Sequence, residues 1–151
     1  MTPHPDFETL EFPTSFPLGA FQLDILTVDD LDEDFREVTR SADVLRGLFG
    51  PTWPDGLTRS YDATDLHWHH REFTAKRSFA WVIRDAEATY LGCAYLSPDM
   101  GRHGSGLATY WIVDRPDRIA LLAEFGPLYT GWLTRKLPSD YQLRVQSNAS
   151  L

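Results

Sequence analysis

Three short apolar runs follow one another in the second half of the chain, and they constrain the fold more than any other feature. The runs are Phe79–Ile83, Tyr90–Leu96 and Leu107–Val113, and turn-forming residues separate them. Apolar runs of this length with turns between them predict an antiparallel meander of three strands. Apolar side chains fall on both faces of the runs, so helices must cover the sheet on both faces. The sequence therefore predicts an α/β (α+β) fold with a mixed, mostly antiparallel sheet.

The composition is that of a folded domain. Of the 151 residues, 42% are hydrophobic and 13% are aromatic, which favours a packed core. The formal net charge of −8 repels phosphate backbones, so we expect no nucleic acid partner. No apolar run has the length of a membrane span, and residues 1–13 contain no signal-peptide core. We therefore expect no membrane association and a cytoplasmic location.

The N-terminal segment differs in composition from the rest. Residues 1–18 contain four of the ten prolines and no helical period, so we expect an extended leader whose aromatic side chains can dock on the body. Residues 19–151 are expected to form a single domain. In that domain, Phe21–Thr27 alternates apolar and polar residues, which predicts a half-buried or edge strand.

Three helices are expected between this strand and the meander. Thr27 or Asp29 is a suitable N-cap for a helix that runs to about Arg40. Ser41 can cap a second, short helix that Gly50 and Pro51 would end. The third is expected over Asp62–Lys76.

A helix and a strand are expected after the meander. Asp117–Leu137 has a helical pattern, and Gly126-Pro127 in its middle predicts a kink or two shorter helices. Tyr141–Gln146 alternates again and predicts an edge strand. A strand, a helix and another strand form a crossover, which would make this last strand parallel to the one before it.

This order of elements resembles the GCN5-related N-acetyltransferase (GNAT) superfamily, which transfers acetyl from acetyl-CoA to amines. The resemblance is closest to a short bacterial GNAT-like subgroup. The segments that carry it are Leu26–Asp30, Leu66–Phe73, Ser78–Val82, Leu91–Leu96, Tyr110–Val113 and the end of the last strand at Val145, Asn148 and Ser150.

The chain departs from the family pattern in two places. In the family, a glycine-rich loop at a helix N-terminus holds the CoA pyrophosphate with its backbone amides. Here no glycine lies between Val113 and Phe125, and Asp114 and Asp117 occupy that place, so the pyrophosphate loop is degenerate. The family's next helix and closing hairpin would lie beyond Leu151.

The resemblance implies acetyl-CoA as a substrate, and it implies sites for both reactants. The pantetheine arm would pair with the backbone at the end of the Leu107–Val113 run, and loop aromatics would face the acceptor. The residues implied for the cofactor are Ile112, Val113, Asp114, Arg118 and Asn148, and those for the acceptor substrate are Trp53, Tyr61 and Tyr110.

A histidine cluster offers candidate catalytic groups. His69 and Glu72 are three residues apart on the expected helix and share a side, so we treat them as a candidate proton-handling pair. His67 and His70 are also three apart, but the HExxH spacing is absent and no second ligand cluster exists, so we expect no metal.

Two other polar segments have two interpretations each. Gly101–Gly106 has the composition of a phosphate cradle, but it precedes a strand, which favours a hairpin loop. Arg115 and Arg118 can pair with phosphates or can bridge the neighbouring aspartates.

Three hypotheses follow. The first is an N-acetyltransferase acting on an unknown amine, which is either a small molecule or a protein N-terminus or side chain. The alternative is a catalytically degenerate GNAT-like module that binds a small molecule or a protein. The third is a homodimer in which the edge strand Tyr141–Gln146 pairs with that of a second copy.

Overall fold

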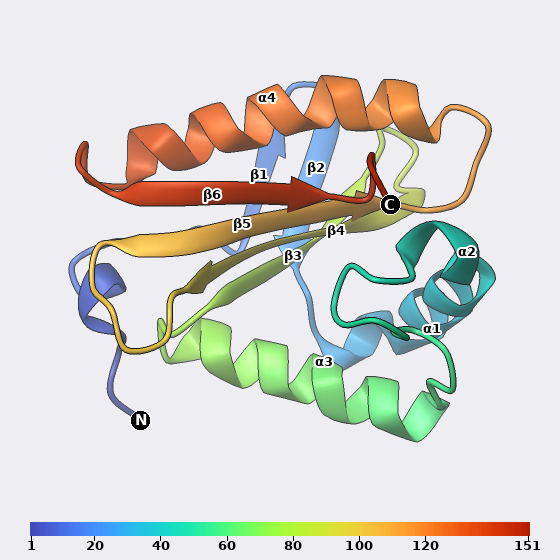
Figure 1. Cartoon of the computed structure of the whole chain (residues 1–151), viewed down its shortest axis with the longest axis horizontal. Coiled ribbons are helices and arrows are strands. Elements are labelled where there is room, and N and C mark those ends of the chain that lie inside the picture. The colour runs from blue at the N-terminus through green and yellow to red at the C-terminus, as the bar shows by residue number, and fades with distance from the viewer.

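A single six-stranded sheet organises the molecule. The computed structural model describes residues 1–151, and the strands lie in the sheet in the same order as in the chain (Figure 1). Neighbouring strands are antiparallel except β5 and β6, which are parallel. The predicted mixed sheet with a parallel edge strand is confirmed. The strands are β1 (Ser15–Leu18), β2 (Phe21–Ile25), β3 (Phe79–Arg84), β4 (Tyr90–Pro98), β5 (Ser105–Ile112) and β6 (Gln142–Ser147).

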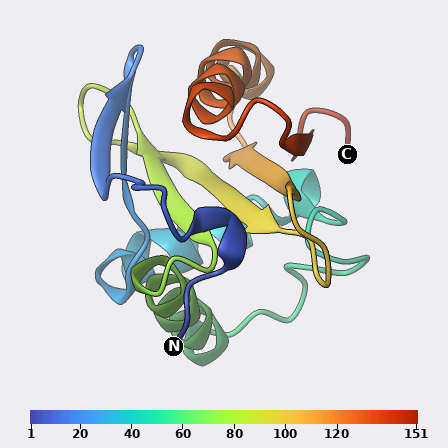
Figure 2. The same ribbon diagram turned by 90° about the vertical axis from the view of Figure 1, so that its left-hand side faces the viewer.

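Helices lie on both sides of the sheet, as predicted. One face carries α1 (Leu31–Arg40), α2 (Ala42–Leu45) and α3 (Arg59–Thr74), and the other carries α4 (Arg118–Lys136). Figure 2 shows the twisted sheet between α4 and α3. No helix combines the length and the hydrophobicity that crossing a membrane requires.

The predicted meander is the centre of the core. β3, β4 and β5 pair as antiparallel neighbours, and the first five residues of β3 and the first seven of β4 are buried. At Gly92 the backbones of β4 and β5 approach so closely that a Cβ atom would lie 1.9 Å from the carbonyl oxygen of Trp111. Only glycine fits there, which explains an apolar strand interrupted by glycine.

The N-terminal segment contributes to the same core. It contains the 3-10 turn η1 (Pro5–Phe7) and the strand β1, which pairs with β2. Phe7, Phe12 and Phe16 are buried, and the Trp81 indole donates a hydrogen bond to the Pro13 carbonyl at 2.9 Å. The segment is therefore more structured than the extended leader expected from its prolines.

The helix starts follow local capping chemistry, with one correction. Thr27 caps the 3-10 turn η2 (Val28–Asp30), which leads into α1, and Thr58 caps α3 three residues earlier than predicted. Ser41 does not cap α2 with its side chain. Its hydroxyl instead accepts a hydrogen bond from the Asp114 backbone N–H at 2.9 Å. Ser41 therefore occupies the predicted N-cap position of α2, but its hydroxyl bonds the distant Asp114 backbone and does not cap the helix.

The helix α4 is continuous through its proline. It runs over 19 residues with Pro127 inside, so the prediction of two shorter helices is wrong. Buried residues on both sides of the proline, among them Leu122, Phe125 and Leu133, pack into one core. This shared burial outweighs the backbone hydrogen bond lost at Pro127.

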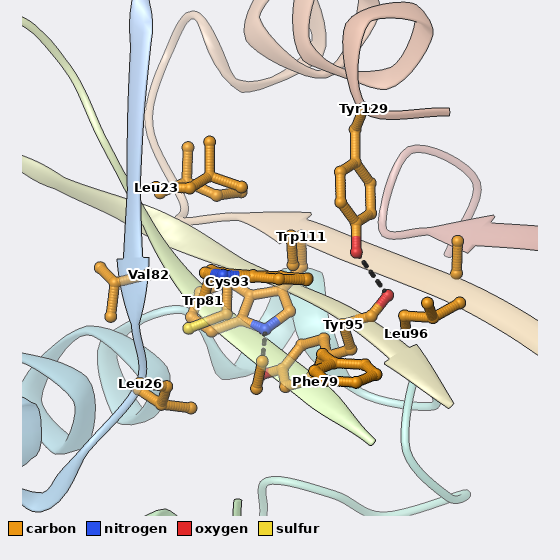
Figure 3. Close-up of a cluster of buried hydrophobic side chains, with 14 of the residues drawn as sticks. Leu23, Leu26, Phe79, Trp81, Val82, Cys93, Tyr95, Leu96, Trp111 and Tyr129 are labelled. Atoms are coloured by element: carbon orange, nitrogen blue, oxygen red, sulfur yellow. Dashed lines mark hydrogen bonds between the residues drawn. The ribbon is translucent and has the colours of Figure 1, made fainter. Parts of the chain in front are cut away.

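A buried aromatic network fixes Tyr95 in the middle of the sheet (Figure 3). The Tyr129 hydroxyl, from α4, donates a hydrogen bond to the Tyr95 carbonyl at 2.8 Å. The Trp111 indole donates to the Tyr95 hydroxyl at 3.1 Å. Tyr95 is thereby held from both sides, and its ring reaches the cavity described next.

Candidate functional site

A cavity of about 500 Å³ opens between the sheet and α3. Strands β4, β5 and β6 form its floor, and α3 and the loop before α3 form its walls. We call it the aromatic pocket. Its lining consists of Phe49, Trp53, Leu57, Tyr61, Asp65, Trp68, His69, Tyr95, Ser97, Leu107, Thr109 and Gln146.

Aromatic side chains dominate the walls. The Phe49 ring packs edge-on against Trp53 at 4.9 Å and against Tyr95 at 5.2 Å between ring centroids. Tyr61 and Trp68 on α3 are 74% and 45% exposed. Large aromatics that stay exposed around a concave site are typical of ligand contact.

Asp65 and His69 supply the charged chemistry of the pocket. They lie one turn apart on α3, and His69 Nε2 is 3.4 Å from an Asp65 carboxylate oxygen. The His69 ring also packs at 5.4 Å from the Tyr95 ring. Asp65 was not among the residues predicted from the sequence, although its spacing of four residues from His69 is a signal of a shared helix face.

The polar part of the floor joins the two parallel strands. The Gln146 side-chain amide, on β6, donates a hydrogen bond to the Thr109 hydroxyl on β5 at 3.0 Å. Both residues line the pocket together with Ser97. The floor thus offers hydroxyl and amide groups next to the aromatic walls.

A buried carboxyl pair lies near the pocket. Asp34 on α1 and Asp62 on α3 are both buried, and the Tyr90 hydroxyl donates to Asp34 at 2.6 Å. Burial, and then the neighbouring Asp34, raise the pKa of Asp62 to about 9. Burial also raises the pKa of Asp34. Asp62 therefore carries a proton at neutral pH and lets the two carboxyl groups coexist.

The structure separates the two residues of the candidate catalytic pair. His69 lines the pocket, whereas Glu72 does not and instead lies 3.3 Å from Arg77 and 3.6 Å from Arg71. The Glu72 carboxylate is therefore engaged in ion pairs away from the cavity. No group of three or more His, Cys, Asp or Glu side chains is arranged to hold a metal ion.

The three predicted acceptor residues divide between the two faces of the sheet. Trp53 and Tyr61 line the pocket. Tyr110 instead packs against α4, with its ring 5.5 Å from Phe125 and its hydroxyl against Gly126. Side chains alternate along a strand, so Tyr110 faces away from the pocket that its neighbour Thr109 lines.

The predicted cofactor residues meet at the end of β5, where Asn148 extends the strand pairing. Backbone pairing of β5 with β6 stops at Tyr110 and Ser147. Beyond it, the Asn148 side-chain amide accepts from the Ile112 N–H at 3.1 Å and donates to the Ile112 carbonyl at 2.8 Å. The N–H of Val113 donates to Leu91. The backbone at the end of β5 therefore has internal partners.

Three arginines surround the segment between β5 and α4. Arg40 donates to the Asp114 carbonyl at 2.7 Å, and Arg118 donates to the Asn148 carbonyl at 2.5 Å. Arg115 forms an ion pair with Asp117 at 2.5 Å. Positive side chains thus gather where the family pattern has glycine amides, and Glu37 and Asp117 form ion pairs with Arg40 and Arg115.

The glycine-rich segment Gly101–Gly106 covers the turn after β4 and the start of β5, and the Asp6 carboxylate binds its backbone. Both carboxylate oxygens of Asp6 accept from the Gly104 N–H at 3.0 Å. A carboxylate at this amide disfavours a second anion there. The segment therefore lacks the electrostatics of a phosphate cradle.

Solved acetyltransferase structures share this architecture. A putative ribosomal-protein-serine acetyltransferase from Vibrio cholerae aligns with 96% of this chain and 75% of its own, at 16% identity and a TM-score of 0.67. The ribosomal alpha-N-protein acetyltransferase RimL, in complex with coenzyme A, aligns with 87% of this chain and 73% of its own, at 11% identity and a TM-score of 0.67.

A third similar structure binds a different set of ligands. It is the microcin C7 self-immunity acetyltransferase MccE, in complex with acetyl-CoA and AMP, which aligns with 76% of this chain and 68% of its own, at 11% identity and a TM-score of 0.55. No protein-family profile and no curated protein matches the sequence. The likeness therefore lies in the arrangement of the strands and helices: this chain has the GNAT fold of the N-acetyltransferases.

Proposed function

We propose that the protein is an N-acetyltransferase that transfers acetyl from acetyl-CoA to an amine bound in the aromatic pocket. The observation that carries the proposal is the position of this pocket. In the GNAT fold it lies over the parallel strands β5 and β6, and residues of both strands line it. Pairing of these strands stops at Tyr110 and Ser147, so an amine in the pocket would lie on the same strands as a thioester bound at their ends.

The chemistry requires an uncharged amine. Its nitrogen lone pair attacks the thioester carbonyl carbon, a C–N bond forms, and the C–S bond breaks to release the CoA thiol. The amine must lose one proton before the attack and another as the amide forms. His69 is the pocket residue suited to accept a proton, and Asp65, 3.4 Å from its Nε2, can orient the ring.

The arginines offer an alternative to the missing glycine loop. Arg40, Arg115 and Arg118 lie around the segment before α4. Arginine pairs with phosphate in a bidentate geometry, so these side chains can neutralise the pyrophosphate of CoA without bare backbone amides. The positive end of the α4 dipole adds to this attraction.

Acetyl-CoA would have to displace the Asn148 side-chain amide from the backbone of Ile112. This amide engages both backbone groups of Ile112, which are the groups that a pantetheine amide would pair with. Binding would exchange one amide for another at Ile112, so the number of hydrogen bonds there can be conserved. The cost is then the movement of Asn148 and of its bond to Val44 at 3.2 Å.

A specific observation favours a second candidate function, an amine-binding module without transferase activity. The backbone groups of Ile112 are paired to Asn148 and the Asp114 N–H is paired to Ser41. If these contacts persist, the pocket binds its ligand and no acetyl donor reaches it.

Isothermal titration calorimetry with acetyl-CoA separates the two functions. Micromolar affinity supports the transferase, and affinity in the millimolar range or weaker overturns it in favour of the binding module. The Arg118→Ala variant is expected to weaken binding by about tenfold, as loss of one charge-assisted contact predicts. Arg71→Ala, which removes an exposed arginine on α3, is the matched control and is expected to leave the affinity unchanged.

A further inference from the structure

The charge of the aromatic pocket limits what it can hold. Asp65 is the single acidic residue of the lining, and the lining contains no lysine or arginine. The Asp65 side chain is 60% exposed, so its carboxylate is accessible to a molecule entering from solvent. An anionic ligand would meet a carboxylate and no fixed positive charge, apart from His69 when it is protonated. The lining therefore favours a cation.

A buried carboxyl pair near the pocket responds to the charge of Asp65. The buried pair Asp34 and Asp62 lies close enough to Asp65 that the Asp65 charge contributes to the raised pKa of both carboxyl groups. A ligand cation would reduce this repulsion. The buried carboxyl pair thus favours a positively charged ligand, as the lining does.

The aromatic walls suit an organic cation better than a metal ion. The walls contain the indole rings of Trp53 and Trp68 and the phenol ring of Tyr61. The electron-rich faces of such rings attract ammonium groups. A hydrated metal ion would need several oxygen or nitrogen ligands, and the pocket has one carboxylate. Aromatic walls also remove the apolar part of a ligand from water.

The size of the pocket fits a small molecule. Its volume of about 500 Å³ lies at the lower end of the range of about 300 to 1,000 Å³ usual for small-molecule sites. A molecule with one ring, for which a cavity of about 150 Å³ is sufficient, fits within a site of this size and occupies part of it. The hydroxyl and amide groups of Ser97, Thr109 and Gln146 can satisfy one further polar group on it.

We infer that the aromatic pocket binds a small amphipathic organic monocation, with an ammonium group at the Asp65 carboxylate and an aromatic or alkyl body against Trp53 and Trp68. The proposed function gives this ligand its chemical role, because such an amine would be the acetyl acceptor. The binding step itself requires no acetyl-CoA. The inference can therefore fail or hold independently of the transferase.

Three probes of nearly equal shape test the inference. They are 2-phenylethylammonium, neutral 2-phenylethanol and anionic 3-phenylpropionate, each titrated into the protein without acetyl-CoA and followed by tryptophan fluorescence and calorimetry. We expect the ammonium to bind at least about tenfold more tightly than the alcohol, as one charge-assisted contact predicts. We expect no saturable binding of the carboxylate.

Variants locate the site. Asp65→Asn is expected to lower the affinity for the ammonium to that of the alcohol and to leave the affinity for the alcohol unchanged. Glu124→Gln removes one exposed charge on α4, on the far side of the sheet, and is expected to change neither. Trp68→Leu is expected to weaken both probes. Equal binding of ammonium and alcohol, tighter binding of the carboxylate, full affinity in Asp65→Asn, or no binding of any probe would overturn the inference.

Discussion

The two faces of the sheet use the same residue types in opposite ways. On the α4 face, Phe125 and Tyr129 are fully buried and stacked at 5.4 Å between ring centroids. On the α3 face near β5, Phe49 and Trp68 remain 41% and 45% exposed around a cavity. Aromatic content alone therefore does not distinguish a packed core from the lining of a pocket.

The difference follows from the element that covers each face. The α4 face is covered by one helix of 19 residues that runs alongside β5 and β6. Opposite it, the chain between α2 and α3 is a loop in which Gly47, Gly50 and Gly56 have positive φ angles. A loop of this kind cannot fill the space beside β5 with a regular row of side chains, and the aromatic pocket is the result.

The largest expected difference between the faces is in stability. Phe125→Ala leaves a cavity in the packed face and is expected to cost about 3 to 5 kcal/mol of unfolding free energy. Phe49→Ala removes the same side chain from the pocket rim and is expected to cost about 1 kcal/mol or less, because Phe49 is 41% exposed. Urea denaturation of both variants measures the difference. Equal losses would show that the pocket face is packed like the α4 face.

The buried carboxyl pair Asp34 and Asp62 predicts a pH dependence of stability. The pKa of Asp62 is raised to about 9 in the folded protein, so the native state binds a proton that the unfolded state releases near pH 4. The stability contributed by this proton is therefore greatest at low pH and declines as the pH rises towards 9, by at most about 1.4 kcal/mol per pH unit.

The Asp62→Asn variant measures the contribution of the Asp62 proton to the pH dependence of stability. The amide keeps a hydrogen-bond donor towards Asp34 and cannot titrate, so the stability of the variant relative to the parent is expected to increase from pH 5 to pH 8. Asp43→Asn, at a side chain that is 88% exposed, serves as the control for the loss of one charge. A constant difference between Asp62→Asn and the parent over this range would contradict the raised pKa.

Close packing between α4 and β5 can be tested at two glycines of one helix. A Cβ at Gly126 would lie 2.3 Å from the Tyr110 hydroxyl, so Gly126→Ala is expected to cost about 1 to 3 kcal/mol. A Cβ at Gly131 would meet only the Arg135 side chain, at 3.4 Å, so Gly131→Ala is expected to be neutral or to stabilise by up to about 1 kcal/mol. Thermal denaturation compares them. If Gly126→Ala is also neutral, Tyr110 is free to move away from α4.

The smallest expected effect concerns the end of β5. Asn148→Ala removes the amide that occupies both backbone groups of Ile112. We expect acetyl-CoA to bind about five- to tenfold more tightly to this variant, because one or two modest hydrogen bonds no longer compete. The variant is also expected to be less stable, since buried backbone groups lose their partner. Weaker binding would mean that Asn148 contacts acetyl-CoA instead.

Much of the fold could be predicted because it depends on local patterns. The apolar runs at Phe79–Ile83 and Tyr90–Leu96 required cover on both faces, and the crossover required a parallel last strand. The errors arose where distant residues decided the outcome. The Ser41 hydroxyl accepts a hydrogen bond from the backbone N–H of Asp114, 73 residues away, and so does not cap α2. The helix α4 remains continuous because the residues on both sides of Pro127 are buried together.

The site could be predicted only in part, for the same reason. Of the residues proposed from the sequence, three line the pocket, namely His69, Trp53 and Tyr61. The sequence also grouped Glu72 with His69 by helical spacing, but neighbouring arginines engage Glu72. Tyr110 was assigned to the acceptor, and strand alternation turns it towards α4. Which face a side chain occupies depends on strand register, which a single sequence does not determine.

The central claim is that an acetyl donor reaches the end of β5 next to an occupied aromatic pocket. The most direct test is a titration of isotope-labelled protein with acetyl-CoA, followed through the Ile112 backbone amide and the Asn148 side-chain amide by nuclear magnetic resonance. We predict that both signals shift together and saturate at micromolar concentrations, because the donor replaces one by the other. If both stay unchanged at millimolar acetyl-CoA, no donor binds at the end of β5, and the transferase proposal is wrong.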